Sequence, residues 1–336
     1  MSSGEGGLRV GVVGATGALG GEVLAVLDAS SLPVAELVPV ATDHSLGEEI
    51  AFQGVEYPVR TEPPRTGALD LLILCAPASA ALEYTREALK AEVPCVDASG
   101  ALATAPEITP RVAAFGPLEN PEAQPLLVAP PGAALPWALA LRPLAEAAGV
   151  RRVVGTALQG ASAAGRLGIE SLYQESVALF NQEDFPQPRV FSRPLAFDCI
   201  PAVGEVDETG NAASEVAAAA ALERLLPGSP GVALTHVHVP IFVGFAASGV
   251  IETERPLTPG EAAELLAKAP GVEVWREAPG DLTPRAVAGR EEVYVGRVRR
   301  DPSSENGLQL WLAADSLRVA AVNAVQLAVA RVARHH

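Results

Sequence analysis

A glycine-rich turn near the N-terminus restricts the fold of this chain more than any other feature. The turn, Gly14-Ala-Thr-Gly-Ala-Leu-Gly20, follows the apolar run Leu8–Val13 and precedes an amphipathic helical pattern from Gly21 to about Leu27. Glycine at the three positions lets the backbone turn tightly and lets a pyrophosphate approach the helix N-terminus. This order of strand, turn and helix predicts a dinucleotide-binding unit. The alternative is a turn that needs glycine for packing alone.

Polar residues follow the second predicted strand, Leu37–Ala41, at the place where such folds contact the adenosine ribose. The Asp43 carboxylate would bond the ribose hydroxyls, or it is a loop carboxylate with no ligand. A carboxylate repels a 2′-phosphate, whereas His44 and Ser45 would accommodate one, so NADP and NAD both remain candidates. The residues expected to bind the cofactor are Gly14, Thr16, Gly17, Ala18, Leu19 and Gly20 of the turn, together with Thr42, Asp43, His44 and Ser45.

Alternating strand and helix patterns continue through the first domain. Strand patterns at Leu69–Ala76 and Val93–Asp97 flank a helical pattern at Ala80–Ala91. Strands that alternate with helices predict an α/β fold with a parallel, doubly wound, Rossmann-like sheet.

The chain changes character after Pro130-Pro131-Gly132, where long connections begin to separate the strand patterns. This spacing is typical of an α+β second domain. We expect helices at Trp137–Ala148 and Ser316–Ala333, strands at Arg152–Leu158, within Val232–Val243 and at Glu292–Val298, and an ordered loop from Phe185 to Pro201. The expected domains are 1–132, completed by the C-terminal helix 316–336, and 133–315.

Charge and cysteine content exclude several classes of protein. The 336 residues carry a formal net charge of −16, which leaves no basic face for nucleic acid or anionic lipid. The uncharged stretch Val232–Ile251 is long enough to span a bilayer, but its β-branched alternation favours buried strands. Three cysteines without CxxC spacing predict neither disulfides nor a metal site. With no signal-peptide pattern at the start, a cytoplasmic protein without a membrane partner is expected.

No side chain stands out by itself as a catalytic group. Cys75 and Cys95 fall on apolar strands, which favours buried structural thiols, and Cys199 lies in a loop without a neighbour that would lower its pKa. His236 and His238 alternate on one strand and so share a face. They could bind a metal or act as a base, but without a third ligand nearby we favour strand histidines with satisfied hydrogen bonds.

Several stretches, in the same order along nearly the whole chain, resemble the aspartate-semialdehyde dehydrogenase family. The Gly14–Gly20 turn resembles the family's cofactor loop, and Thr156–Gly165 resembles its substrate-binding glutamine segment. The similarity runs on from Gln159 into Glu170 and Leu172, and it includes Val295–Asp301, Asn306–Trp311 and Asp315–Gln326 with Asn323. The resemblance implies NADP chemistry in amino-acid biosynthesis, cofactor binding that includes Asn323, and a dimer formed through the second domain.

In enzymes of this family a cysteine thiolate adds to the aldehyde to form a hemithioacetal. The hemithioacetal gives hydride to NADP and leaves a thioester for phosphate. At the cysteine position, after Val128-Ala-Pro-Pro-Gly132, this chain has Ala133. The family's histidine is replaced by Phe245, and the arginine that binds the substrate carboxylate by His238. A phosphate-binding arginine falls at Ala103, and a lysine near Ala217, where only Glu215 of the local motif is recognisable.

The resemblance and these substitutions together predict a catalytically silent, Usg-type member that retains the fold and binds or regulates. Gln159, Glu170 and His238 would be remnants of the substrate site, and no catalytic residue is intact. NADP or NAD would be the cofactor if one is retained, with no metal. A homodimer is expected, or a mixed dimer with an active paralogue. The alternative is an oxidoreductase that acts on a semialdehyde or another carbonyl compound without the usual cysteine.

Overall fold

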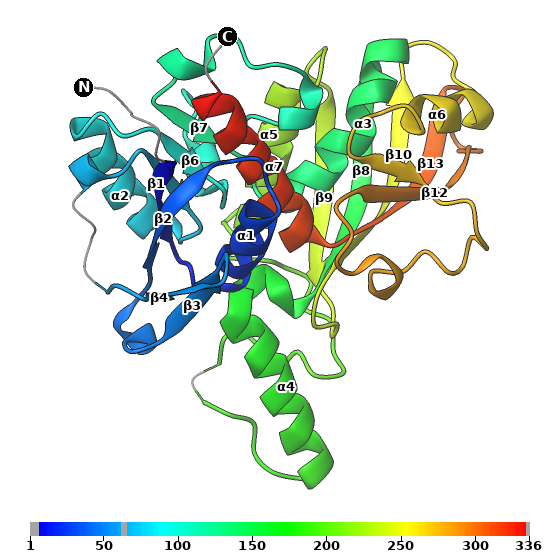
Figure 1. The fold of residues 1–336 in the computed structure, drawn as a ribbon. Helices are drawn as coiled ribbons and strands as arrows, with labels where there is room; N and C mark the ends of the chain where they lie inside the picture. Colours follow the sequence, from blue (N-terminus) through cyan, green and yellow to red (C-terminus); the bar gives the residue numbers. More distant parts are fainter. Residues whose placement is uncertain (1–6, 62–65, 188, 334–336) are drawn as a thin grey trace. The chain divides into compact units, whose positions relative to one another are not determined.

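The computed structural model describes residues 7–61, 66–187 and 189–333, which divide into two compact units (Figure 1). Unit 1 comprises Met1–Pro130 and Ala320–His336, and unit 2 comprises Pro131–Val319. The domain limits expected from the sequence lie close to these, at 132 against 130 and at 316 against 320.

Unit 1 is built on a parallel sheet of five strands in the order β2-β1-β5-β6-β7. The strands are β1 (Leu8–Val13), β2 (Val34–Val40), β5 (Leu71–Leu74), β6 (Cys95–Asp97) and β7 (Leu126–Val128), and a hairpin of β3 (Glu49–Phe52) and β4 (Val55–Pro58) lies between β2 and β5 in sequence. The strand order reverses between β1 and β5. In open parallel sheets, ligands bind beyond the carboxyl ends of the two strands at such a reversal.

Helices cover both faces of this sheet. On one face, α1 (Ala18–Asp28) and the part of α7 (Ser316–Val332) that belongs to unit 1 share an apolar core with Val10, Val12 and Ile73. On the other face, α2 (Ala78–Lys90) packs against Leu72 and Leu74. Burial on both faces accounts for the uninterrupted apolar run of β5. The predicted doubly wound, Rossmann-like fold is confirmed.

Unit 2 is built on a mixed sheet of six strands in the order β11-β12-β13-β10-β8-β9. Its elements are α3 (Ala134–Ala148), β8 (Val150–Gln159), α4 (Gly165–Asn181), α5 (Ala213–Leu225), β9 (Gly231–His238), β10 (Phe245–Thr253), α6 (Pro259–Leu266), β11 (Val272–Val274), β12 (Val293–Arg300) and β13 (Gly307–Ala314). β8 pairs antiparallel with β10 and parallel with β9. This α/β arrangement agrees with the expected α+β second domain.

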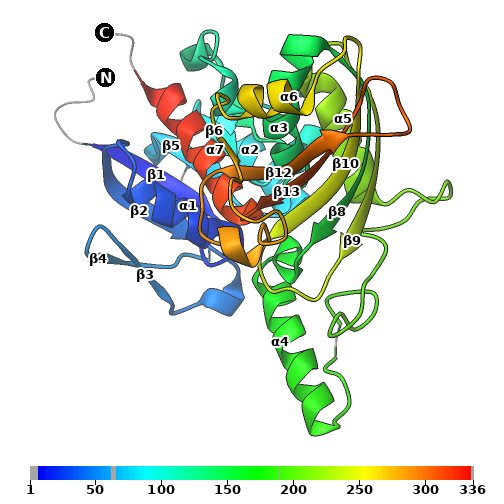
Figure 2. The same ribbon diagram turned by 90° about the vertical axis from the view of Figure 1, so that its right-hand side faces the viewer.

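The position of α3 on the unit 2 sheet is fixed by one tryptophan and two glycines. A Cβ atom on Gly155 or Gly249 would lie 2.8 or 2.5 Å from the Trp137 indole, so the bare backbone of β8 and β10 makes room for the ring. Helices α5 and α6 pack beside α3, whereas α4 leads away from the sheet (Figures 1 and 2). The face of the sheet that carries Gly155 and Gly249 is therefore the helix-covered face.

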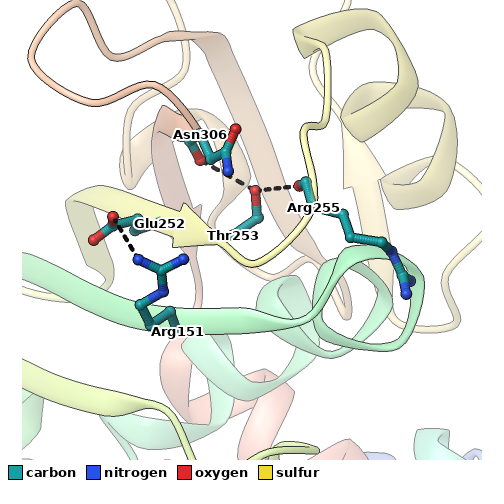
Figure 3. Close-up of polar contacts among 5 residues, drawn as sticks. All are labelled: Arg151, Glu252, Thr253, Arg255 and Asn306. Atoms are coloured by element: carbon teal, nitrogen blue, oxygen red, sulfur yellow. Dashed lines mark hydrogen bonds and ion pairs between the residues drawn. The ribbon is translucent and has the colours of Figure 1, made fainter.

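The end of the sheet where β8 begins and β10 ends is held by polar contacts (Figure 3). The Thr253 hydroxyl lies 2.7 Å from the carbonyl oxygen of Arg255 and 3.1 Å from that of Asn306, and Arg151 pairs with Glu252 at 3.4 Å. The Arg255 guanidinium donates to the carbonyl oxygen of Ala147 at the end of α3. This end of the unit is stabilised by bonds made within the chain.

Most elements expected from the sequence are present, with shifted limits. Helix α1 begins at Ala18 instead of Gly21, and β8 runs to Gln159. The strand expected to reach Val243 ends at His238, because Pro240 has no N–H for strand pairing and the chain turns there. Within the described residues, no helix has the length and apolar character needed to cross a membrane.

Candidate functional site

The glycine turn of unit 1 forms a close contact at the strand-order reversal. Gly14 has φ +80°, and a Cβ atom on it would lie 2.4 Å from the carbonyl oxygen of Cys75, which follows β5. A Cβ on Gly20 would lie 2.1 Å from the carbonyl oxygen of Gly14. Only glycine fits both positions. The turn therefore brings the N-terminus of α1 against the carboxyl ends of β1 and β5.

This N-terminus has the features that a pyrophosphate requires. Gly17 is the residue before the first helical turn, and no side chain caps the helix. The N–H groups of that turn, from Ala18 to Gly20, have no acceptor within the helix because they precede its first full hydrogen-bonded turn. Unpaired N–H groups at the positive end of an 11-residue helix attract phosphate oxygens. The residues present thus fit a dinucleotide.

The structure links the glycine turn to the expected ribose region. The hydroxyl groups of Thr16 and Ser45 lie 2.9 Å apart, and the N–H groups of Gly14 and Ala15 both donate to the carbonyl oxygen of Val40. Ser45 is buried, whereas Thr42, Asp43 and His44 are exposed beyond β2. The predicted cofactor residues of the turn and of residues 42–45 therefore lie on neighbouring strand ends, and their contacts with a cofactor stay a prediction.

The Asn323 side chain makes hydrogen bonds that hold unit 1 together. Its Oδ1 atom accepts a hydrogen bond from the N–H of Ala113 at 2.8 Å, and its Nδ2 donates to the carbonyl oxygen of Arg111 at 3.2 Å. These bonds join α7 to the loop before β7. The role in cofactor binding implied by the family resemblance is a prediction.

The segment that resembles the family's phosphate-binding segment, Asp97–Ala103, is ordered by a carboxylate. Asp97 is fully buried, and its oxygens accept from the N–H and hydroxyl of Ser99 and from the N–H of Leu102 at 2.6–3.0 Å. Burial raises the pKa of this carboxyl, although the hydrogen bonds oppose the change. Ala103 is buried in the same segment. Asp97 therefore shapes the loop, and the methyl of Ala103 offers nothing to an anion.

The cysteines on the apolar strands have the character of structural thiols. Burial raises the pKa of Cys95 to about 12 and that of Cys75 further, and the nearby Asp97 carboxylate adds to both effects. Neither thiol is a thiolate near neutral pH, which is the reactive form. Cys199 is exposed in the loop after α4.

In unit 2, three of the predicted site residues lie at adjacent positions of the sheet. Gln159 ends β8, and the strand register pairs it with His238 on β9 and with Phe245 on β10. Residues paired across neighbouring strands project to the same face. Alternate residues of a strand lie on the same face, and Gly155 lies four residues before Gln159 on β8. Gln159 therefore lies on the helix-covered face, which carries Gly155. Phe245 is fully buried there.

Ala133 joins the same end of unit 2. It immediately precedes α3, which runs antiparallel to β8 because only Gly149 separates the two elements. The start of α3 therefore lies near the end of β8, over the face that carries Gln159, His238 and Phe245. A cysteine at position 133 would stand at a helix N-terminus, which stabilises a thiolate. Alanine offers no reacting atom.

The two histidines of β9 share a face, as predicted, but their hydrogen bonds are not fully satisfied as expected, because one ring nitrogen of each has no partner in the described structure. Nε2 of His236 and Nδ1 of His238 are buried without a hydrogen-bond partner in the described structure. Burial lowers the pKa of each, to about 4 for His236. The Phe191 ring meets His238 edge to face at 5.0 Å between centroids. Both imidazoles are therefore neutral at pH 7.

A second buried group, centred on His236, was not anticipated. The Ser214 hydroxyl lies 2.9 Å from Nδ1 of His236, and Glu215 accepts from the N–H groups of His236 and Ala212 at 2.8 Å. Oε1 of Glu215 thus joins α5 to β9, and Oε2 caps the N-terminus of α5. Glu215 is engaged in holding the helix to the sheet.

The other predicted site residues lie elsewhere in unit 2. Glu170 is exposed on α4 and not on the sheet, so its part in a substrate site stays a prediction. Its neighbour Glu175 is buried and accepts from the N–H groups of Leu195 and Ala196. Among the described residues, no three His, Cys, Asp or Glu side chains gather in a way that would hold a metal.

Comparison with known proteins agrees with the geometry of both units. The family model for the semialdehyde dehydrogenase NAD binding domain matches residues 9–130, and the model for the semialdehyde dehydrogenase dimerisation domain matches residues 141–319. The aspartate-semialdehyde dehydrogenase of Aquifex aeolicus is 32% identical over 338 residues, covering 96% of this chain and 97% of the relative. The chain belongs to the aspartate-semialdehyde dehydrogenase family.

Solved structures of the family have the same fold. The crystal structure of aspartate semialdehyde dehydrogenase II from Vibrio cholerae, complexed with ASA, has a TM-score of 0.89 at 29% identity and covers 96% of this chain and 98% of that chain. A probable aspartate-semialdehyde dehydrogenase from Pseudomonas aeruginosa has a TM-score of 0.86 at 29% identity, with 96% and 97% covered. The chain thus has the NAD(P)-binding and dimerisation domains of the aspartate-semialdehyde dehydrogenase family.

Sequence reasoning missed Ser162 and Phe191 at this end of unit 2. Both are buried, and Ser162 Oγ has no hydrogen-bond partner in the described structure. Ser162 lies within the segment that resembles the family's glutamine motif, so a small polar residue between alanines was an available signal. Phe191 reaches His238 from the proline-rich loop, and no local pattern indicates that contact.

Proposed function

We propose that this protein is a catalytically silent member of the aspartate-semialdehyde dehydrogenase family, which binds NAD(P) and acts through binding or regulation. The observation that carries the proposal is the pairing of Gln159 with Phe245 and the placement of Ala133 at the start of α3. The family's reaction needs a nucleophile and an acid/base at positions 133 and 245. A methyl group and a phenyl ring occupy them.

The chemistry of these side chains leaves no covalent route. A methyl group neither attacks a carbonyl carbon nor holds a thioester, so the family's intermediate has no attachment point. A phenyl ring neither accepts nor donates a proton. Cys75 and Cys95 do not replace it, because burial raises the pKa of both thiols. Cys199 is the exposed thiol, and Cys199→Ala tests it directly.

Binding of the dinucleotide is supported by unit 1. When bound, a nicotinamide dinucleotide supplies or accepts hydride in this family. In this chain Gly14, Gly17 and Gly20 would let its pyrophosphate approach the N–H groups that open α1, and residues 42–45 would meet its ribose. None of these groups depends on Ala133 or Phe245. Cofactor binding and silence are thus compatible.

Titration calorimetry of the full chain with NADPH, NADP, NADH and NAD tests this part of the proposal. We expect saturable binding of at least one of them at up to millimolar concentration. Gly17→Val places a branched side chain between the approaching phosphate and the helix and should abolish the binding, whereas Gly54→Asn, on an open hairpin turn, should not. The absence of heat with all four nucleotides would refute cofactor retention.

The association state bears on how a silent member acts. The dimerisation domain supports a homodimer. A mixed dimer with an active paralogue would let the silent chain alter its partner's activity. Native mass spectrometry after co-expression with an active family member distinguishes the two: heterodimer masses support regulation through pairing, and only homodimer masses of both chains exclude it.

A further inference from the structure

Three buried polar atoms at the end of β8 have no hydrogen-bond partner in the described structure. They are Nε2 of Gln159, Oγ of Ser162 and Nδ1 of His238, in side chains whose residues are 8%, 2% and 6% exposed. We call these residues the Gln159 cluster. A buried polar atom without a partner is destabilising, and native proteins leave few of them. The cluster therefore requires an explanation.

The opposite end of the same sheet provides the contrast. There the Thr253 hydroxyl and the Arg151 side chain bond to groups of this chain (Figure 3). The Arg255 side chain donates to the carbonyl oxygen of Ala147. One end of the sheet satisfies its polar side chains internally, and the other does not. Unpaired groups gather at functional sites because a bound molecule completes their bonds there.

The backbone around the cluster is held in place from several sides. The N–H groups of Gly160, Ala161 and Ser162 donate to carbonyl oxygens of residues 241–244 at 2.8–3.0 Å. His238 exchanges two backbone hydrogen bonds with Ile200, and its ring rests against Phe191. The three side chains consequently extend from a rigid frame. Their missing bonds do not come from a loose segment.

The three side chains of the Gln159 cluster are uncharged at neutral pH. Gln159 and Ser162 carry no charge, and burial keeps the His238 imidazole neutral at pH 7. Phe245, Phe191 and Ala133 add apolar surface at the same end of the unit. A buried carboxylate or phosphate without a cation beside it is strongly disfavoured, whereas a neutral amide or carbonyl group needs only its hydrogen bonds.

We infer that the Gln159 cluster binds a small uncharged ligand with a carboxamide or similar group, in place of the anionic substrate group of the family's enzymes. The ligand's carbonyl oxygen accepts from the Gln159 amide and the Ser162 hydroxyl. Its N–H donates to Nδ1 of His238 in the tautomer that carries the proton on Nε2. The inference rests on the proposed function, because it takes His238, a neutral acceptor, to stand where the family's enzymes have the arginine that binds the substrate carboxylate.

A matched pair of four-carbon probes tests this preference. Succinamide and succinate have the same chain length and differ in that two amides replace two carboxylates. Titration of the full chain at pH 7.5, by calorimetry and by chemical shifts of the side-chain amides, should give succinamide at least tenfold tighter binding. Gln159→Leu should weaken succinamide binding at least tenfold. The control Gln309→Leu, on β13, should leave it unchanged.

A charge substitution provides the second arm. His238→Arg places a guanidinium in the cluster and should reverse the preference, so that succinate binds more tightly than succinamide. Equal or tighter binding of succinate by the unmodified chain would overturn the inference, as would no binding of either probe or unchanged binding in Gln159→Leu. These titrations use no nucleotide and no turnover. A negative titration would therefore overturn this inference without bearing on cofactor binding or on the absence of catalysis. Conversely, enzymatic turnover would refute the absence of catalysis without changing the preference between the two probes.

Discussion

Phe245 on β10 is paired with Gln159 on β8, and both side chains lie on the face of the unit 2 sheet that α3 covers. The family's acid/base and its substrate-binding glutamine would thus be neighbours in this frame. Here one position keeps its amide and the other carries a buried phenyl ring. This pairing supports the proposal that the frame of the site is retained without its reacting groups.

The position of Ala133 predicts a reactive thiol in Ala133→Cys. A thiol at the N-terminus of the 15-residue helix α3 has its thiolate stabilised by the helix dipole, and Ala133 is partly exposed. Alkylation by iodoacetamide at pH 7, followed by peptide mass spectrometry, should modify the new thiol several-fold faster than Cys199, which is exposed without a helix N-terminus. Equal rates would show that α3 does not activate position 133.

Gly20 and Gly21 give a matched pair within α1. In Gly20→Ala the methyl would lie 2.1 Å from the carbonyl oxygen of Gly14, so the turn must open. We expect the unfolding free energy to fall by about 3 kcal/mol, and the stabilisation by bound NAD(P) to be lost. Gly21→Ala meets nothing within 4 Å and should raise stability by about 0.5–1 kcal/mol. Urea unfolding with and without nucleotide measures both, and similar behaviour of the two variants would contradict the account.

The structure explains why some of this was predictable from sequence and some was not. The glycine turn, β1 and the buried run of β5 have local signatures, and their places follow from steric and burial rules. The pairing of Gln159 with Phe245 depends on strands 86 positions apart (245 against 159), which no local pattern encodes. The family resemblance supplied those positions. The edge-to-face contact of Phe191 with His238 and the bonds of Glu215 to β9 arise only from tertiary packing.

The buried His236 predicts acid sensitivity. Its pKa of about 4 in the folded protein lies below the ordinary value of 6.5, because burial disfavours the imidazolium. The unfolded chain therefore binds this proton first as the pH falls. The contribution of the neutral His236 to the unfolding free energy is fully present above about pH 6.5. It is lost as the pH falls toward about 4, and the loss is roughly 3 kcal/mol at most.

Urea unfolding at pH 7 and at pH 4.5 measures this loss. The pKa of Asp97 is raised by burial, which acts in the opposite direction, so the informative comparison is between the unmodified chain and His236→Asn. The asparagine amide can still bond the Ser214 hydroxyl without titrating. Its unfolding free energy should fall less between the two pH values. The same fall in both proteins would exclude His236 as the cause.

Asn323 predicts a stability effect in unit 1. Asn323→Leu removes the acceptor of the Ala113 N–H and the donor to the carbonyl of Arg111, which leaves two backbone groups unpaired. We expect a loss of about 1–3 kcal/mol. The control Gln326→Ala, exposed on the same helix, should change stability by less than about 0.5 kcal/mol. Equal effects of the two substitutions on thermal unfolding would show that the hydrogen bonds of Asn323 do not stabilise unit 1.

We propose that this family member does not perform the family's reaction. The most direct test follows reduction of NADP by the purified full chain in the presence of aspartate semialdehyde and phosphate, with the Cys199→Ala variant measured beside it. The account predicts no NADPH formation above that of a protein-free control in either sample. Turnover in the unmodified chain would contradict it, and the Cys199→Ala variant would then show whether Cys199 is the nucleophile.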